Sequence, residues 1–184
     1  NDAPTVTSAI ADASTAEDAS YSLNAAAAFT DVDSGDTLTY TMSGAPSTLS
    51  ISSGTISGTP TNANVGAHTI VVTATDGSNA AVSDTFILTV TNTNDAPTIS
   101  STAVTTATED AAYSYTTTAA DVDVGDTVTL TCTTVPSWMT CASGALTGTP
   151  VNANVGAHSV VITASDGTAS VTDSFTVTVA NTND

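Results

Sequence analysis

The sequence contains no lysine and no arginine among its 184 residues, against 18 aspartates and glutamates, so its formal net charge at pH 7 is −18. Nucleic-acid binding depends on cationic side chains that displace counterions from phosphates, and attachment to an anionic membrane surface depends on them too. Both classes of partner are therefore excluded. Since no Lys or Arg can pair with the carboxylates, protons or metal ions must neutralise them, and the composition favours a cation-binding protein.

Aromatic residues are also few, at 4%, and strong helix formers such as Leu and Glu are scarce. Thr, Ser, Ala, Val, Asn and Asp dominate instead. Thr and Val favour strands, whereas Asn, Asp and Gly favour turns, so we predict an all-β protein. No apolar run approaches the length of about 18 residues that a membrane-spanning helix needs. The sequence has neither a signal peptide nor an initiating Met, and we expect it to be a piece of a larger protein.

Cysteine is limited to Cys132 and Cys141, in the second half of the chain, where the first half has the apolar residues Met42 and Ile51. The alternation around Cys132 places it on the apolar face of a strand. A disulfide is the favoured interpretation, and two buried free thiols are the alternative. Zinc needs three or four protein ligands and the two histidines lie elsewhere. A disulfide would indicate an oxidising, extracellular location.

The chain consists of two copies of one unit. The opening tetrapeptide Asn1–Pro4 returns as Asn94–Pro97, and the linker residues Asn92–Asp95 return as Asn181–Asp184. A polar, acidic linker that stops at a proline therefore joins two domains, which we place at residues 1–93 and 94–184. Each is long enough for one small hydrophobic core.

Alternating polar and apolar residues predict half-buried strands in each copy. Residues 37–42, 69–75 and 85–90 show this alternation in the first copy, and a further strand is expected over Thr5–Ile10. Short strands with turn signals about every 8–12 residues are typical of an antiparallel sandwich. The sequence therefore predicts two tandem seven-stranded Greek-key β-sandwiches.

The acidic residues recur at equivalent positions, with Asp12 as the exception. One series is Asp2, Asp95 and Asp184, and the pairs are Glu17/Glu109, Asp18/Asp110, Asp31/Asp121, Asp33/Asp123, Asp36/Asp126, Asp76/Asp166 and Asp84/Asp173. A solvated acidic surface needs its charge but not fixed positions, so the recurrence favours a metal site over a merely solubilising surface. Inheritance from a recent duplication is the alternative. Calcium takes 6–8 oxygen ligands, and an Asp-x-Asp segment presents two carboxylates on one side of an extended chain.

The motifs follow a recognisable order. A Glu is followed by Asp-x-Asp, then by Ala-x-Asp-Gly, then by an Asn-x-Asn-Asp-x-Pro linker, an order that resembles cadherin repeats. The Gly-Thr-Pro segment and the Asn- and Gly-rich loop after it resemble the bacterial and dystroglycan-type cadherin-like (putative Ig-like) repeats of large secreted adhesins. The resemblance covers both copies and implies cadherin/Ig-like sandwiches in an elongated arrangement, with Ca²⁺ between successive domains.

Carried over position by position, the resemblance implies one complete calcium site. Its ligands would be Glu17 from the first repeat, Asn92, Asn94 and Asp95 from the linker, and Asp121, Asp123 and Asp166 from the second repeat, with Asp126 as a further ligand. Two half-sites would be Asp31, Asp33 and Asp76 at one end and Glu109, Asn181, Asn183 and Asp184 at the other. The linker has Asn92 and Ala96 where cadherins have Asp and Asn, so we expect about two ions rather than a larger number.

No catalytic site is expected, because paired carboxylates of a glycosidase would lie in a substrate cleft and these acids form cation-like clusters. His68 and His158 recur at the start of a strand, where a structural role is expected. The sequence thus predicts a calcium-rigidified extender of a bacterial cell-surface adhesin, secreted and monomeric, whose partners are neighbouring repeats of the same polypeptide. The alternatives are a carbohydrate-binding module that uses Trp138, and calcium-dependent homophilic adhesion.

Overall fold

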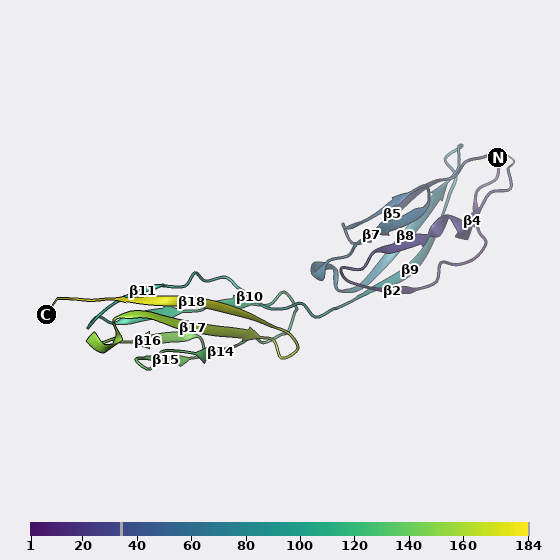
Figure 1. Cartoon of the computed structure of the whole chain (residues 1–184). Helices are drawn as coiled ribbons and strands as arrows, with labels where there is room; N and C mark the ends of the chain where they lie inside the picture. The colour runs from purple at the N-terminus through teal and green to yellow at the C-terminus, as the bar shows by residue number, and fades with distance from the viewer. Residues whose placement is uncertain (34, 184) are drawn as a thin grey trace. The chain divides into compact units, whose positions relative to one another are not determined.

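A computed structural model describes residues 1–33 and 35–183 as two compact units, Asn1–Thr93 and Asn94–Asp184 (Figure 1). Ser34, in the first acidic loop, and Asp184, in the last predicted half-site, lie outside the described residues. The described chain is all-β, and its helical segments are three single turns: η1 (Ala25–Ala28), η2 (Asn62–Asn64) and η3 (Asn152–Asn154). The all-β prediction is confirmed.

Unit 1 is a sandwich of two main sheets. Its strands are β1 (Thr5–Val6), β2 (Ala13–Ala16), β3 (Tyr21–Asn24), β4 (Phe29–Thr30), β5 (Thr39–Ser43), β6 (Leu49–Ser52), β7 (Thr55–Gly58), β8 (Gly66–Thr75) and β9 (Ala81–Thr91). One sheet has the order β2-β9-β8-β5 and the other β3-β7-β6, while β1 pairs with β4. All pairs are antiparallel except β2 with β9, which is parallel.

Unit 2 repeats this topology. Its strands are β10 (Thr98–Ile99), β11 (Thr106–Thr108), β12 (Tyr113–Thr116), β13 (Ala119–Ala120), β14 (Thr129–Thr134), β15 (Met139–Ala142), β16 (Ala145–Gly148), β17 (Gly156–Ser165) and β18 (Ser170–Ala180). The sheet orders are β11-β18-β17-β14 and β12-β16-β15, with β10 paired to β13. Corresponding strands thus occupy corresponding places, as expected of a duplicated unit.

The seven predicted strands are present in unit 1, and two of them are interrupted. The second, which the sequence favours over residues 21–29, is divided by η1 into β3 and β4. The first is strand only at Thr5–Val6, and the chain then forms β2, which the sequence analysis missed. The prediction of a continuous strand over Thr5–Ile10 was wrong because this segment leaves β4 and crosses to β9 on the other sheet. Asp84 accepts the crossing segment's Ile10 N–H at 2.5 Å.

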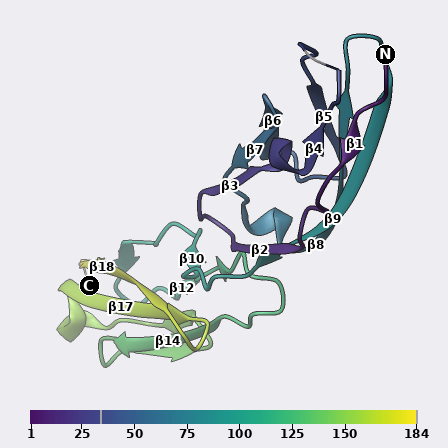
Figure 2. The same cartoon turned by 90° about the vertical axis from the view of Figure 1, so that its right-hand side faces the viewer.

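The core of each unit lies between its sheets. In unit 1 the hairpin of β8 and β9 supplies its centre, where Ile70 lies opposite Phe86. These two residues, Val72 and Leu88 are each no more than 1% exposed. Figure 2 shows these two long strands running side by side. The period-2 pattern of residues 69–75 and 85–90 is therefore the alternation between core and solvent.

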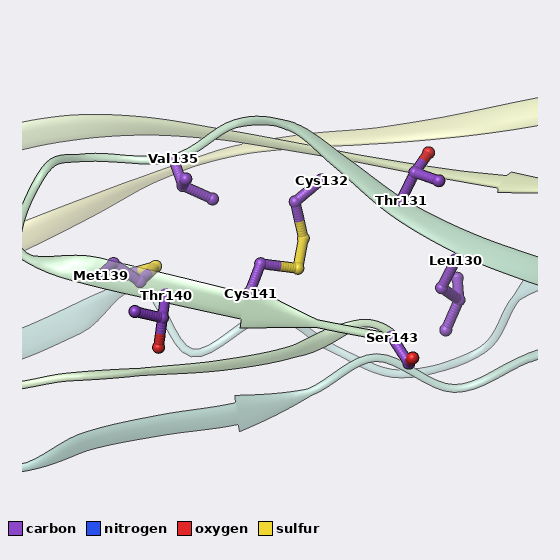
Figure 3. Close-up of a pocket in the computed structure, with 8 residues that line it drawn as sticks. All are labelled: Leu130, Thr131, Cys132, Val135, Met139, Thr140, Cys141 and Ser143. Carbon is purple, nitrogen blue, oxygen red and sulfur yellow. A yellow bond between two sulfur atoms is a disulfide. The ribbon is translucent and has the colours of Figure 1, made fainter.

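A disulfide joins the two sheets of unit 2. It links Cys132 in β14 to Cys141 in β15, with their Cα atoms 6.3 Å apart, and its sulfur atoms are drawn in Figure 3. In unit 1 the equivalent side chains, Met42 in β5 and Ile51 in β6, pack against the core instead. The structure confirms the disulfide over two free thiols.

Candidate metal sites

Three carboxylates of unit 1 gather at the end of the sandwich where β8 ends. Asp31 follows β4, Asp36 precedes β5 and Asp76 follows β8, and one oxygen of each lies within 4.8 Å of the others. Strands that end at the same edge bring these residues together although they are far apart in sequence. Asp36 was not among the predicted ligands of this half-site.

Unit 2 has the same cluster. One carboxylate oxygen each of Asp121, Asp126 and Asp166 lies within 4.8 Å of the others. Reduced hydration of the Asp126 carboxyl, followed by repulsion from Asp123, Asp121 and Asp166, raises the pKa of Asp126. Such crowding of like charges favours either a proton or a cation among the carboxylates.

The Asp-Gly loop holds its carboxylate as an anion. In unit 2 the backbone N–H groups of Ala169 and Thr168 donate to Asp166 Oδ1, and Asn94 Nδ2 donates to Oδ2 at 3.1 Å. These hydrogen bonds lower the pKa of Asp166, and those from the backbone have the largest effect. In unit 1 the Asn1 side chain, followed by backbone N–H groups of the loop, likewise lowers the pKa of Asp76.

The first two residues of each repeat attach to the Asp-x-Asp segment and the Asp-Gly loop of that repeat. Asp95 N donates to Asp123 Oδ2 at 2.8 Å, beside the Asn94–Asp166 hydrogen bond. In unit 1, Asp2 N donates to Asp33 Oδ2 at 2.6 Å, beside the bond from Asn1 to Asp76. Asp33 and Asp123 therefore anchor the backbone of the linker with one oxygen, while their neighbours Asp31 and Asp121 belong to the carboxylate clusters.

The predicted glutamates lie at the opposite end of each unit and are buried. Glu17, 2% exposed, accepts the N–H of Thr93 through Oε1 at 2.9 Å, and its buried Oε2 has no hydrogen-bond partner. Glu109, 3% exposed, accepts the N–H of Thr182 through Oε2 at 3.0 Å, and its Oε1 has none. Asn92, which precedes Thr93, is exposed.

The donor set suits a hard cation such as Ca²⁺. The clustered ligands are oxygens, which Ca²⁺ prefers, whereas transition metals would favour imidazole or thiolate. Besides the two glutamates, Asp31 and Asp121 each have a buried Oδ2 with no hydrogen-bond partner. Because the sequence contains no Lys or Arg, no such side chain can compensate these buried charges, whose burial is costly without a counter-ion.

The histidines and the tryptophan lie outside these clusters. The ring Nε2 of His68 lies 2.7 Å from the carbonyl oxygen of Asn64, and Nε2 of His158 lies 2.6 Å from that of Asn154. A carbonyl only accepts, so Nε2 is the donor in both rings, as expected of a structural histidine. Trp138 is half-buried and packs edge-on against His158 and Tyr113.

Comparison with known proteins identifies the repeated unit. The family model described as putative Ig domain (He_PIG) matches residues 3–91 and again residues 96–180. None of the curated proteins matches the chain. No helical turn in the described part of the chain has the length or apolar character needed to span a membrane.

Solved structures with cadherin repeats have the same fold. Protocadherin gamma B2 extracellular cadherin domains 3–6 match 98% of the chain at 17% identity with a TM-score of 0.60, and mouse cadherin-23 EC22–24 matches 98% at 20% identity with 0.57. An endo-fucoidan hydrolase of glycoside hydrolase family 107 matches 98% at 28% identity with a TM-score of 0.47. The chain spans 48%, 65% and 29% of these three chains. The cadherin matches establish two tandem cadherin-like, Ig-like β-sandwiches.

Proposed function

Because the chain belongs to the putative Ig domain family, with one repeat in each of its two units, we propose that it is an extender module of a secreted bacterial surface adhesin. Its role is structural: the repeats act as a stalk whose stiffness depends on Ca²⁺ bound where one repeat follows the next. The partners of each repeat are then its neighbours in the same polypeptide, and the module works as a monomer.

The observation that carries this proposal is the buried, half-satisfied glutamate. In Glu17 and in Glu109, one carboxylate oxygen accepts a hydrogen bond from a backbone N–H, and the other is buried without a hydrogen-bond partner. A carboxylate oxygen buried in this way, in a chain with no Lys or Arg, is suited to binding a metal ion. Because the same arrangement occurs in both repeats, we favour a metal-ligand role for these glutamates over a purely structural one.

The linker is short enough to serve both groups of ligands. Glu17 accepts the N–H of Thr93 and Asp123 accepts that of Asp95. Asn94 is the single residue between these two anchored residues in the sequence. Each group of ligands therefore holds its own part of the linker through a hydrogen bond. We assign the site to Glu17, Asn92, Asn94, Asp95, Asp121, Asp123 and Asp166, with Asp126 as an added ligand.

These residues would hold Ca²⁺ through their side-chain oxygens, and the bound ion would supply the positive charge that the chain lacks in Lys and Arg. Asp95 and Asn94 hold the linker backbone, Asp121 and Asp126 supply closely spaced carboxylates, and Glu17 supplies its unpartnered oxygen. Extracellular modules bind Ca²⁺ with dissociation constants of roughly 10⁻⁴–10⁻³ M, which suits millimolar calcium outside the cell. The disulfide also suits that location.

Small-angle X-ray scattering of the full chain tests the proposal. We expect a narrower distribution of interdomain distances in about 5 mM Ca²⁺, which exceeds the roughly 0.1–1 mM dissociation constants of such modules, than in chelator. Asp95→Ala should reproduce the chelated profile in the presence of Ca²⁺. The stiffening role is wrong if the scattering profile does not respond to Ca²⁺, and the assignment of the linker site is wrong if Asp95→Ala leaves the calcium isotherm unchanged.

A further inference from the structure

Unit 2 has an open cavity beside its disulfide, at the edge where the two sheets meet (Figure 3). Its volume is about 500 Å³, within the usual range of small-molecule sites. It is lined by Leu130, Thr131, Cys132, Val135, Met139, Thr140, Cys141 and Ser143. These residues come from β14, from β15 and from the segments that follow them. The cavity lies outside the acidic clusters, and none of its lining residues is charged.

The corresponding region of unit 1 contains larger side chains. Tyr40 stands opposite Ala74 in the β5–β8 pair, as Leu130 stands opposite Ala164 in the β14–β17 pair. The tyrosine ring is therefore absent from unit 2. Besides this change, the two disulfide cysteines replace the bulkier Met42 and Ile51, so the inter-sheet edge of unit 2 carries less side-chain volume than that of unit 1.

A second aromatic ring of unit 1 also has no counterpart in unit 2. In unit 1 the ring of Phe29 lies 6.0 Å from that of Tyr40. Phe29, the first residue of β4, pairs with Val6. The residue in the corresponding register of unit 2 is Ala119, opposite Ile99. The fold thus accommodates a pair of aromatic rings beside this edge in one repeat and has none at these positions in the other.

The lining of the cavity suits an aromatic ring. Three sulfur-bearing residues, Cys132, Cys141 and Met139, contribute to the wall, and sulfur makes favourable contacts with aromatic rings. The exposed Ser143 can hydrogen-bond one polar substituent. Thr131 and Thr140 alternate with the inward-facing residues of their strands, and the Thr140 hydroxyl already pairs with Thr147. The lining offers no charged partner for a charged ligand, and the net charge of −18 repels anions, so we take the ligand to be uncharged.

We propose that this cavity binds an uncharged, single-ring aromatic molecule that carries one hydroxyl group. The ring packs against the disulfide, Met139 and Leu130, and the hydroxyl group reaches the exposed Ser143 side chain. This binding is reversible and involves no covalent step with the disulfide. It is independent of the calcium sites, so its test is carried out in chelator as well as in Ca²⁺.

The test uses p-cresol and the full chain, labelled with ¹³C at the methionine methyl groups. The sequence contains two methionines, Met139 in the cavity wall and Met42 in unit 1, so each unit reports with one signal. We expect a saturable shift of the Met139 signal and no shift of the Met42 signal. Leu130→Tyr places a ring in the cavity and should weaken binding about tenfold or more, roughly the loss of one buried ring contact.

Two controls make each outcome decisive. Thr176→Tyr adds the same side chain at an exposed position of β18 and should bind p-cresol as the unmodified chain does. The saturated analogue 4-methylcyclohexanol, which needs no variant, should bind more weakly than p-cresol. A Met139 signal that does not shift, equal shifts of both methionines, or equal binding of the saturated analogue would each overturn the proposal.

Discussion

Glu17 accepts the backbone N–H of Thr93 through one carboxylate oxygen at 2.9 Å, while its other oxygen is buried without a hydrogen-bond partner. The two residues are far apart in sequence, and the bond fixes the start of the linker to the base of the first repeat. It also leaves an uncompensated anion at that base. Replacing this side chain should therefore act in opposite directions with and without calcium.

Glu17→Gln keeps an oxygen for Thr93 and removes the charge. In chelator we expect unit 1 to become more stable, by about 1–3 kcal/mol, because a buried charge without a counter-ion is lost. In Ca²⁺ the ion should stabilise the variant less than it stabilises the unmodified chain. Thermal unfolding with and without Ca²⁺ measures both effects. Asp12→Asn is the control, because Asp12 has no counterpart in the second repeat and accepts the Ile87 N–H; a similar response of both variants would contradict the assignment of Glu17.

Asp126→Asn should raise the melting temperature of unit 2 in chelator at pH 7. Reduced hydration and three neighbouring carboxylates raise the pKa of Asp126, so its charged form opposes folding. For a carboxyl whose folded pKa is raised, stability is gained as pH falls through that pKa, and the advantage of the variant should shrink on acidification. Asp110→Asn, at an exposed residue outside this cluster, should show no such trend. A pH-independent gain would rule out titration of Asp126 as its cause.

Asp166 should show the opposite pH dependence. Its hydrogen bonds lower its pKa below the ordinary 3.8, so its contribution to stability is present above that value and is lost as pH falls through the lowered pKa. Asn94→Ala removes one donor to Asp166 and should reduce the contribution. Melting temperatures of unit 2 between about pH 2 and pH 6 measure this, and identical profiles for both proteins would exclude the Asn94 bond as a contributor.

Reduction of the disulfide should destabilise unit 2 and leave unit 1 unchanged. The bond closes a short loop, with a sequence separation of 9, for which the chain-entropy account gives about 2–3 kcal/mol. Calorimetry with and without a reductant should therefore show one transition that moves and one that does not. Cys132→Met with Cys141→Ile reproduces the residues of unit 1 and should be insensitive to the reductant. Equal shifts of both transitions on reduction would show that the units do not unfold independently.

Gly54→Ala should cost more than Gly66→Ala, although both glycines have a positive φ. At Gly54, with φ +76°, an added Cβ would lie 2.5 Å from the Cβ of Ala26, whereas at Gly66 no atom lies within 4 Å of it. A positive φ costs a residue with a Cβ about 1–3 kcal/mol at either position, and the clash adds roughly 1–3 kcal/mol at Gly54 alone. Urea unfolding of the two variants measures the difference, and equal costs would show that η1 moves aside freely.

The sequence was most informative where alternation and duplication coincide. Residues 69–75 predicted the inward face of β8 because Ile, Val and Ala alternate with Thr, and the cysteine pair was recognised because it replaces an apolar pair. The small residues of β2 carry no such alternation, so its pairing with β9 depends on where the chain crosses between sheets. The third carboxylate, Asp36, could have been found from its match with Asp126. The orphaned oxygen of Glu17 could not, because it depends on which backbone groups come within reach after folding.

The bond between Cys132 and Cys141 also sets how far unit 2 can be stretched. A pulled chain whose cross-link is intact cannot extend the segment between the two cysteines, whose Cα atoms stay 6.3 Å apart across a sequence separation of 9. Full extension of that segment would add roughly 25 Å of contour length. Unit 1 has no cross-link between Met42 and Ile51, so it releases this length whenever it unravels. Under a pulling force the two repeats therefore differ in the contour length that they release on unfolding. This difference exists while the disulfide is intact and disappears when it is reduced.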